Sequence, residues 1–163
     1  TRFDLLEMAG IAKAKLVIIA IDDPKKALSI VPHLRHTYND LPIVARAYDR
    51  IHAYQLHKAG ASAVIRETFD SAVRSARTGL ELLGMDSEIA ERIAHLYHHR
   101  DRDGVAAAAE TYDPNISRYK NTHMISMLNH HRAHTKMMIE KILRGEEVKW
   151  QPKRGTYLGQ ENQ

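Results

Sequence analysis

The chain has 163 residues, 44% of them hydrophobic and 27% charged, a balance typical of one globular domain with a real core. It contains no cysteine, which excludes disulfides, thiol catalysis and cysteine-ligated metal. The formal net charge of +4 predicts a modest attraction for anions, but the basic residues are dispersed among acidic ones and predict no nucleic-acid partner. The longest apolar run, LVIIAI, has strand length, so neither a membrane span nor a secretory signal is predicted.

The first eleven residues, TRFDLLEMAGI, predict a helix that is entered at once and ends near Gly10. A chain that opens inside such an element is expected to be part of something longer.

After Gly10, a strand followed by a helix occurs three times. The predicted strands cover 15–22, 41–49 and 62–67. Each leads into a helix through a residue that favours a helix cap, namely Asp23, Asp49 and Thr68.

Three local expectations follow from these segments. The strand at 15–22 is apolar throughout, as is typical of a strand covered on both faces, so a missing upstream strand or a second chain is expected to cover its edge. Pro32 is expected to kink or divide the helix at about 24–39. The inward face of the helix that follows Thr68 is predicted to include Phe69, Val73 and Leu80.

The alternation of strands and helices predicts an α/β fold, a partial Rossmann-like parallel sheet of three strands with flanking helices. Beyond residue 85 the strands stop and an all-helical extension is predicted, with helices at about 86–109 and 117–144 separated by a turn at 111–115. The predicted divisions are 1–85 for the sheet half, 86–145 for the helical extension and 146–163 for a disordered tail.

Charged side chains gather at the carboxyl ends of the predicted strands, where ligands of parallel sheets bind. Arg46 and Arg66 emerge there from neighbouring strands, with Asp49 and Glu67 beside them. The planar guanidinium fork grips carboxylates and phosphates through two hydrogen bonds, so this edge is a candidate anion site. The alternative is a structural ion pair at the strand ends, worth little if exposed.

Other chemistry finds less support. The pairs His95/His99 and His130/His134 have the i, i+4 spacing of metal ligands, but solvated helix faces explain them more simply, and no metal site is predicted. Asp22 and Asp23 invite comparison with the acidic pocket of a receiver domain, yet a helix cap beside a solvated neighbour is favoured. The sequence contains no glycine-rich phosphate loop and no G-x-S-x-G element, and no catalytic residue is predicted.

The segments LPIVARAYD (41–49), LHKAGASAVIRETFDSA (56–72) and LELLGM (80–85) resemble the nucleotide-binding regulatory domain of Kef-type glutathione-gated potassium efflux systems, of the TrkA-N or regulator-of-potassium-conductance class. The resemblance runs from residue 1 to about 101. It begins after the third strand of the family's six-stranded Rossmann sheet, so the family's glycine-rich nucleotide loop, which would hold NAD or AMP, is expected to lie upstream of Thr1, and no cofactor is expected within this chain.

The resemblance implies a non-enzymatic module on the cytoplasmic face of the bacterial inner membrane. In this family the domain dimerises and holds a potassium/proton antiporter closed; glutathione keeps it shut and bulky glutathione adducts open it. The implied partners are a second copy of the domain, bound through helices, the transport domain of the same protein, and a soluble flavoprotein as ancillary subunit. The Met-rich helix at 124–138 suits the first two.

The implied ligand residues are Arg66, which matches the family arginine that contacts the peptide ligand, and Asp49, with Arg46 added from the strand ends. Asp101 stands where glutathione-gated members carry asparagine. An ionised carboxylate accepts hydrogen bonds but donates none, and it repels the carboxylates of a ligand. The possibility that this is a related antiporter controlled by a ligand other than glutathione therefore stays open. Two other classes also stay open: a fragment of a Rossmann NAD(P)-dependent oxidoreductase, and a ligand-free interaction module.

Overall fold

The structure, a computed structural model, describes residues 3–117 and 119–148. These residues divide into two compact units, one ending at Glu67 and one beginning at Thr68. No helix in this part of the chain is long and apolar enough to cross a bilayer. The predicted division at residue 85 stays a prediction, and most of the predicted disordered tail lies outside the described residues.

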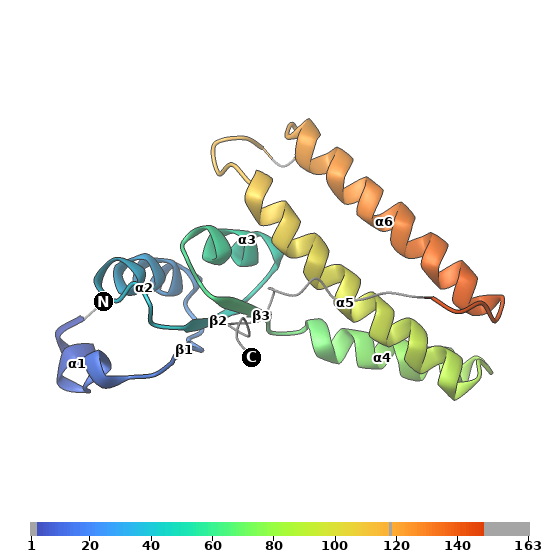
Figure 1. The fold of residues 1–163 in the computed structure, drawn as a ribbon, viewed down its shortest axis with the longest axis horizontal. Coiled ribbons are helices and arrows are strands. Elements are labelled where there is room, and N and C mark those ends of the chain that lie inside the picture. The colour runs from blue at the N-terminus through green and yellow to red at the C-terminus, as the bar shows by residue number, and fades with distance from the viewer. Residues whose placement is uncertain (1–2, 118, 149–163) are drawn as a thin grey trace, which may run out of the picture. The chain divides into compact units, whose positions relative to one another are not determined.

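The first unit contains the predicted parallel sheet, with its strands in the order β1-β2-β3 (Figure 1). The repeat of strand and helix is confirmed. The elements of this unit are α1 (Phe3–Met8), a 3-10 helix η1 (Ile11–Lys13), β1 (Val17–Ile19), α2 (Pro24–Thr37), β2 (Ile43–Ala47), α3 (Arg50–Lys58) and β3 (Ala63–Arg66).

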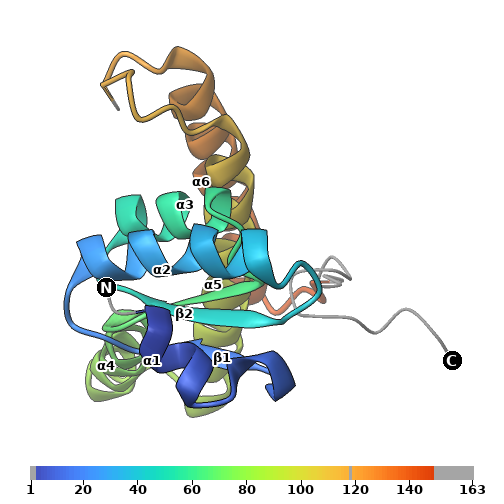
Figure 2. The same ribbon diagram turned by 90° about the vertical axis from the view of Figure 1, so that its left-hand side faces the viewer.

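Helices α2 and α3 lie on one face of this sheet, as Figure 2 shows. Alternate residues of β2 point to this face and are fully buried, namely Ile43, Ala45 and Ala47. On the opposite face Ile18 is 66% exposed and Ile65 is 40% exposed. The expectation that the first strand is covered on both faces is therefore wrong for the described chain.

The free edge of β1 is a second consequence of this topology. Among the described residues β1 pairs with a strand on one side only, which is β2. Main-chain N–H and C=O groups along such an edge are ready to pair with a further strand. The predicted neighbour, from an upstream segment or a second chain, stays a prediction.

Two of the three predicted caps are confirmed. The Asp23 carboxylate accepts hydrogen bonds from the backbone N–H groups of Lys25 at 3.0 Å and Lys26 at 3.1 Å, and Asp49 caps α3 in the same way. Thr68 makes no side-chain cap, because its φ of −108° and ψ of −2° lie near the helical region and not in the extended conformation of a capping residue.

Pro32 does not divide α2, which continues through it. Proline removes one helical hydrogen bond by lacking an N–H group. Because Pro32 is exposed, water can solvate the carbonyl that is left without that bond. The helix therefore remains one element of 14 residues.

Arg35 fastens α2 to the turn that precedes β3. Its Nε donates to the Gly60 carbonyl and its Nη2 donates to Ser62 Oγ, each at 3.0 Å. Ser62 Oγ also accepts the Ile43 N–H at 3.0 Å, which ties the turn to β2. Gly60 has a φ of +99°, and a Cβ there would lie 2.9 Å from Arg35 Cγ, so only glycine fits both the backbone and the space.

The second unit is the predicted helical extension together with the helix before it. In Figure 1, α5 lies between α4 and α6 and runs antiparallel to α6. The core of the second unit is formed by Leu96, Met138 and Ile142, packed with Ile89, Ile93, Ile139 and Val148. The helices are α4 (Phe69–Leu82), α5 (Ser87–Thr111) and α6 (Thr122–Leu143).

The apolar face of α4 is only partly covered within the described residues, by α5. None of its residues is buried, and the leucines at its end, Leu82 and Leu83, are 84% and 87% exposed. The predicted inward face at Phe69, Val73 and Leu80 is therefore only partly buried. The helical pattern is confirmed, but α5 covers only part of this face, and no other described residue covers the rest.

Two methionines of α6 and a glycine of α5 lie where these two helices pack together. Met124 and Met138 are buried, so these two members of the Met-rich stripe serve the fold of the unit. Gly104 sits in the middle of α5, where a Cβ would lie 3.6 Å from His131 Nδ1. That distance is an ordinary van der Waals contact, so the space beside the His131 ring would also admit an alanine.

Candidate ligand site at the strand ends

The carboxyl ends of the three strands are linked by one arginine. Arg46 donates from Nη2 to Asp22 Oδ1 at 2.5 Å, and its Nη1 lies 3.9 Å from Glu67 Oε1. Asp22 follows β1, Arg46 belongs to β2 and Glu67 follows β3, so the arginine joins all three. The side chains of Asp22 and Glu67 are exposed, so each of these pairs contributes at most about 1 kcal/mol to stability.

Arg66 occupies the neighbouring position on β3 but not the same face. In the register of the sheet Arg46 pairs with Ile65, and Arg66 pairs with Ala47. Paired residues share a face and successive residues alternate, so the two arginine side chains leave the sheet on opposite faces. Both stand at the predicted end of the sheet, yet they do not form one double fork. Arg66 is half-buried and already engaged in an interaction.

Asp49 has a structural task at this edge. Its Oδ1 accepts the backbone N–H of His52 at 2.7 Å, which caps α3, and the residue itself is exposed. A carboxylate at a helix N-terminus is stabilised by the N–H groups there. Its second oxygen has further acceptor capacity for a ligand.

His52 is a residue of this edge to which the sequence analysis assigns no role. It is 6% exposed, its Nδ1 accepts the backbone N–H of Tyr48 at 3.1 Å, and its Nε2 has no hydrogen-bond partner among the described residues. Accepting at Nδ1 fixes the neutral ring in the form that carries its proton on Nε2. The only signal in the sequence is its place in the first turn after the Asp49 cap.

Protonation of His52 is expected to weaken the fold. Burial lowers the pKa of His52 from its ordinary value of 6.5, partly opposed by the charge of Asp49. The unfolded chain then binds more protons than the folded chain once the pH falls below about 6.5, so the free energy of unfolding decreases toward acid. Chemical denaturation between pH 7.5 and 5 should show this slope, with a shallower one for His52→Gln. Identical slopes would contradict the assignment.

Asp101 lies in the second unit, on α5. It is 8% exposed and takes part in an interaction of its own. The adjacent Arg100 faces α6, with its Nε 3.4 Å from Thr135 Oγ1 and its Nη2 3.4 Å from His131 Nδ1. A buried carboxylate in the middle of a helix is costly unless it is paired. Asp101 is therefore held by contacts within its own unit.

A shallow hollow of about 460 Å³ opens in the first unit, but at the other end of the sheet. Its lining comes from η1 and from the segment 38–42 that precedes β2. Ligands of parallel sheets bind at the carboxyl ends of the strands, so this hollow has no part in the candidate site. Within the described residues no group of three or more His, Cys, Asp or Glu side chains could hold a metal ion.

Both units match known families. The TrkA-N domain family matches residues 1–67, and the C-terminal domain family of the potassium efflux system KefB matches residues 71–151. The two family matches therefore divide the chain close to the boundary between its two compact units.

Curated relatives share this similarity over most of the chain. Glutathione-regulated potassium-efflux system protein KefC of Salmonella arizonae is 41% identical over 125 residues, or 75% of this chain. The protein of the same name from Klebsiella pneumoniae is 35% identical over 153 residues, or 90% of this chain. The chain spans 20% and 25% of the length of these two relatives.

A solved structure, described as the Shewanella denitrificans Kef CTD in AMP-bound form, is 46% identical with a TM-score of 0.65 and covers 69% of this chain. The match takes in 71% of that structure's own chain. Agreement in sequence and in fold over most of both chains leads to one conclusion. The chain belongs to the family of Kef-type C-terminal regulatory domains of potassium efflux systems.

Proposed function

We propose that the chain is the ligand-sensing regulatory module of a potassium/proton antiporter. It gates potassium efflux through an anionic ligand bound at the carboxyl ends of the strands and at a dimer interface. The ligand is glutathione or one of its adducts, with a nucleotide as a second class. The module binds its ligand and does not catalyse a reaction.

The observation that carries this proposal is the match of both units to potassium efflux proteins whose names describe them as glutathione-regulated. The chemistry of the strand ends supports it, because Arg66 stands where the family resemblance puts the ligand-contacting arginine and its fork suits a carboxylate. Arg46 and Asp49 are the further members of the proposed site. The Arg46 side chain leaves the opposite face of the sheet from Arg66, and a ligand there must compete with Asp22 and Glu67. Asp101 enters on the resemblance alone.

A nucleotide is proposed for the part of the protein that the resemblance expects upstream of this chain. The solved relative from Shewanella denitrificans is described as AMP-bound. This sequence has no glycine-rich loop of the kind that holds pyrophosphate at a helix N-terminus. We therefore assign AMP or NAD to the upstream half and the peptide ligand to the strand ends described above.

The partners and location follow from the same family. We propose that the module works as a homodimer on the cytoplasmic face of the bacterial inner membrane, attached to the transport domain and assisted by a flavoprotein subunit. The exposed Leu82 at the end of α4 and the exposed Leu83 that follows it suit an interface. A ligand opens or closes such a gate only as far as its affinities for the two states differ.

Isothermal titration of the full-length protein tests the proposal. Reduced glutathione, a bulky S-conjugate and AMP are titrated separately, and potassium efflux from proteoliposomes is measured with the same ligands. Binding of a glutathione species with a change in efflux is the expected result. If none of the three ligands binds, the proposal is refuted. Turnover of NAD(P)H in an absorbance assay favours the oxidoreductase alternative instead.

A further inference from the structure

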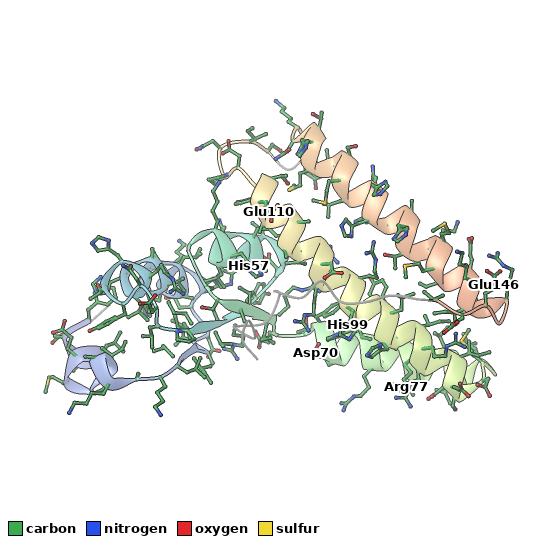
Figure 3. All side chains as sticks on the ribbon, viewed as in Figure 1. His57, Asp70, Arg77, His99, Glu110 and Glu146 are labelled. Atoms are coloured by element: carbon green, nitrogen blue, oxygen red, sulfur yellow. The ribbon has the colours of Figure 1, made fainter. Side chains whose placement is uncertain are left out.

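Two histidines of α5 approach each other with their ring nitrogens. His95 Nε2 and His99 Nε2 are 3.1 Å apart, and the ring centroids are 4.4 Å apart with an angle of 63° between the planes. The two residues are one helical turn apart, which puts them on one face of the helix. Figure 3 labels His99 on α5, with Asp70 on the neighbouring α4.

This separation matches the distance between two nitrogens bound to one metal ion. Imidazole nitrogen binds zinc at 2.0–2.1 Å, so two such ligands lie roughly 2.8–3.4 Å apart for angles between 90° and the tetrahedral value. The distance between His95 and His99 falls inside this interval. The two ring nitrogens therefore already have the separation that a shared metal ion needs.

We propose that His95 and His99 form a two-histidine chelate for a late divalent transition metal such as Cu²⁺, Ni²⁺ or Zn²⁺. Imidazole is a ligand for these ions and not for Mg²⁺ or Ca²⁺, which prefer oxygen. No third protein ligand completes the site among the described residues, so water fills the remaining positions. The proposal rests on no part of the regulatory function proposed above.

The groups around the pair act on His99 in opposite directions. Burial, followed by the charges of His95, His98 and Arg102, lowers the pKa of His99. Asp103 acts in the opposite sense, as a negative charge one helical turn beyond. Asp70 on α4 contacts the neighbouring His98, whose Nε2 lies 2.8 Å from Asp70 Oδ1.

The other reading of the same geometry is a hydrogen bond from one neutral ring to the other, worth about 1 kcal/mol and in need of no metal. The two readings differ in what is lost when both rings are removed. A chelate loses a metal equivalent, whereas a ring-to-ring hydrogen bond loses only a little stability.

Copper titration separates them. The full-length protein and a His95→Ala/His99→Ala variant are titrated with Cu²⁺ alone, by calorimetry and by electron paramagnetic resonance, which reports nitrogen ligands directly. The variant is expected to bind one Cu²⁺ fewer per chain and to lose the signal of two equivalent nitrogens. Each single variant is expected to bind that ion about tenfold or more weakly.

His123→Ala is the matched control, because His123 is an exposed histidine on α6 of the same unit. It is expected to retain the full copper stoichiometry. Circular dichroism checks that every variant is folded; should the alanine pair unfold, His95→Gln/His99→Gln removes the ligands with less change in volume. Equal copper stoichiometry in the wild type and the folded double variant overturns the proposal, as does an equal loss in His123→Ala.

Discussion

An Arg66→Ala substitution is expected to weaken binding of the glutathione species by about 2–3 kcal/mol, or roughly 30- to 150-fold. The reason is that the guanidinium fork supplies charge-assisted hydrogen bonds to a carboxylate that alanine cannot replace. Isothermal titration of the full-length protein measures the change. Arg66→Lys keeps the charge but loses the fork and is expected to recover only part of the affinity.

The matched control is Arg132→Ala, which removes the same charge from an exposed position on α6. A general electrostatic attraction would make the two alanine variants equally weak, whereas a site at β3 makes only Arg66→Ala weak. Unchanged affinity in Arg66→Ala, with the protein folded, would return Arg66 to a structural role and leave the regulatory proposal with the family similarity alone.

A Leu56→Ala substitution is expected to lower the free energy of unfolding by about 2–5 kcal/mol. Leu56 lies on α3 and has no exposed surface. Removing its side chain loses buried apolar area and leaves a cavity between α3 and the sheet, which rigid strands cannot close. Chemical denaturation followed by circular dichroism measures the loss.

Leu83→Ala makes the same chemical change at a leucine that is 87% exposed. In this chain it is expected to alter the free energy of unfolding by less than about 0.5 kcal/mol. A large loss at Leu83 in the full-length protein would show that a partner surface covers it there. Similar losses at both positions in the chain alone would contradict the burial described for α3.

Most helix ends were predictable, because they are set by single residues that act on their immediate neighbours in the chain. Asp23 and Asp49 cap helices through their own neighbours, and Gly60 and Gly84 end helices with a positive φ. The prediction that Thr68 caps α4 was wrong, because serine and threonine cap a helix only when their own backbone is extended. That conformation is set by how the chain leaves β3. The pattern of α4 predicts an apolar face correctly but says nothing about where its cover lies.

The edge of the sheet that carries the candidate site was predictable, but the contacts within it were not. Parallel topology alone brings the ends of the strands together, so the placement of Arg46 and Arg66 at one edge needed only the strand assignments. The face that each side chain takes depends on a register that a shift of one residue would reverse. The pairing of Arg46 with Asp22 joins residues 24 positions apart, and the burial of His52 depends on packing that no local pattern encodes.

The side of β1 that has no strand partner among the described residues has a practical consequence for anyone who prepares this chain by itself. Beside that edge lie the hydrophobic side chains of Leu16 and Ile18, which are 44% and 66% exposed. Two copies can pair along such an edge, so recombinant material is prone to self-associate as its concentration rises. Lysine in place of Ile18 would put a charge on that surface and favour a monodisperse sample.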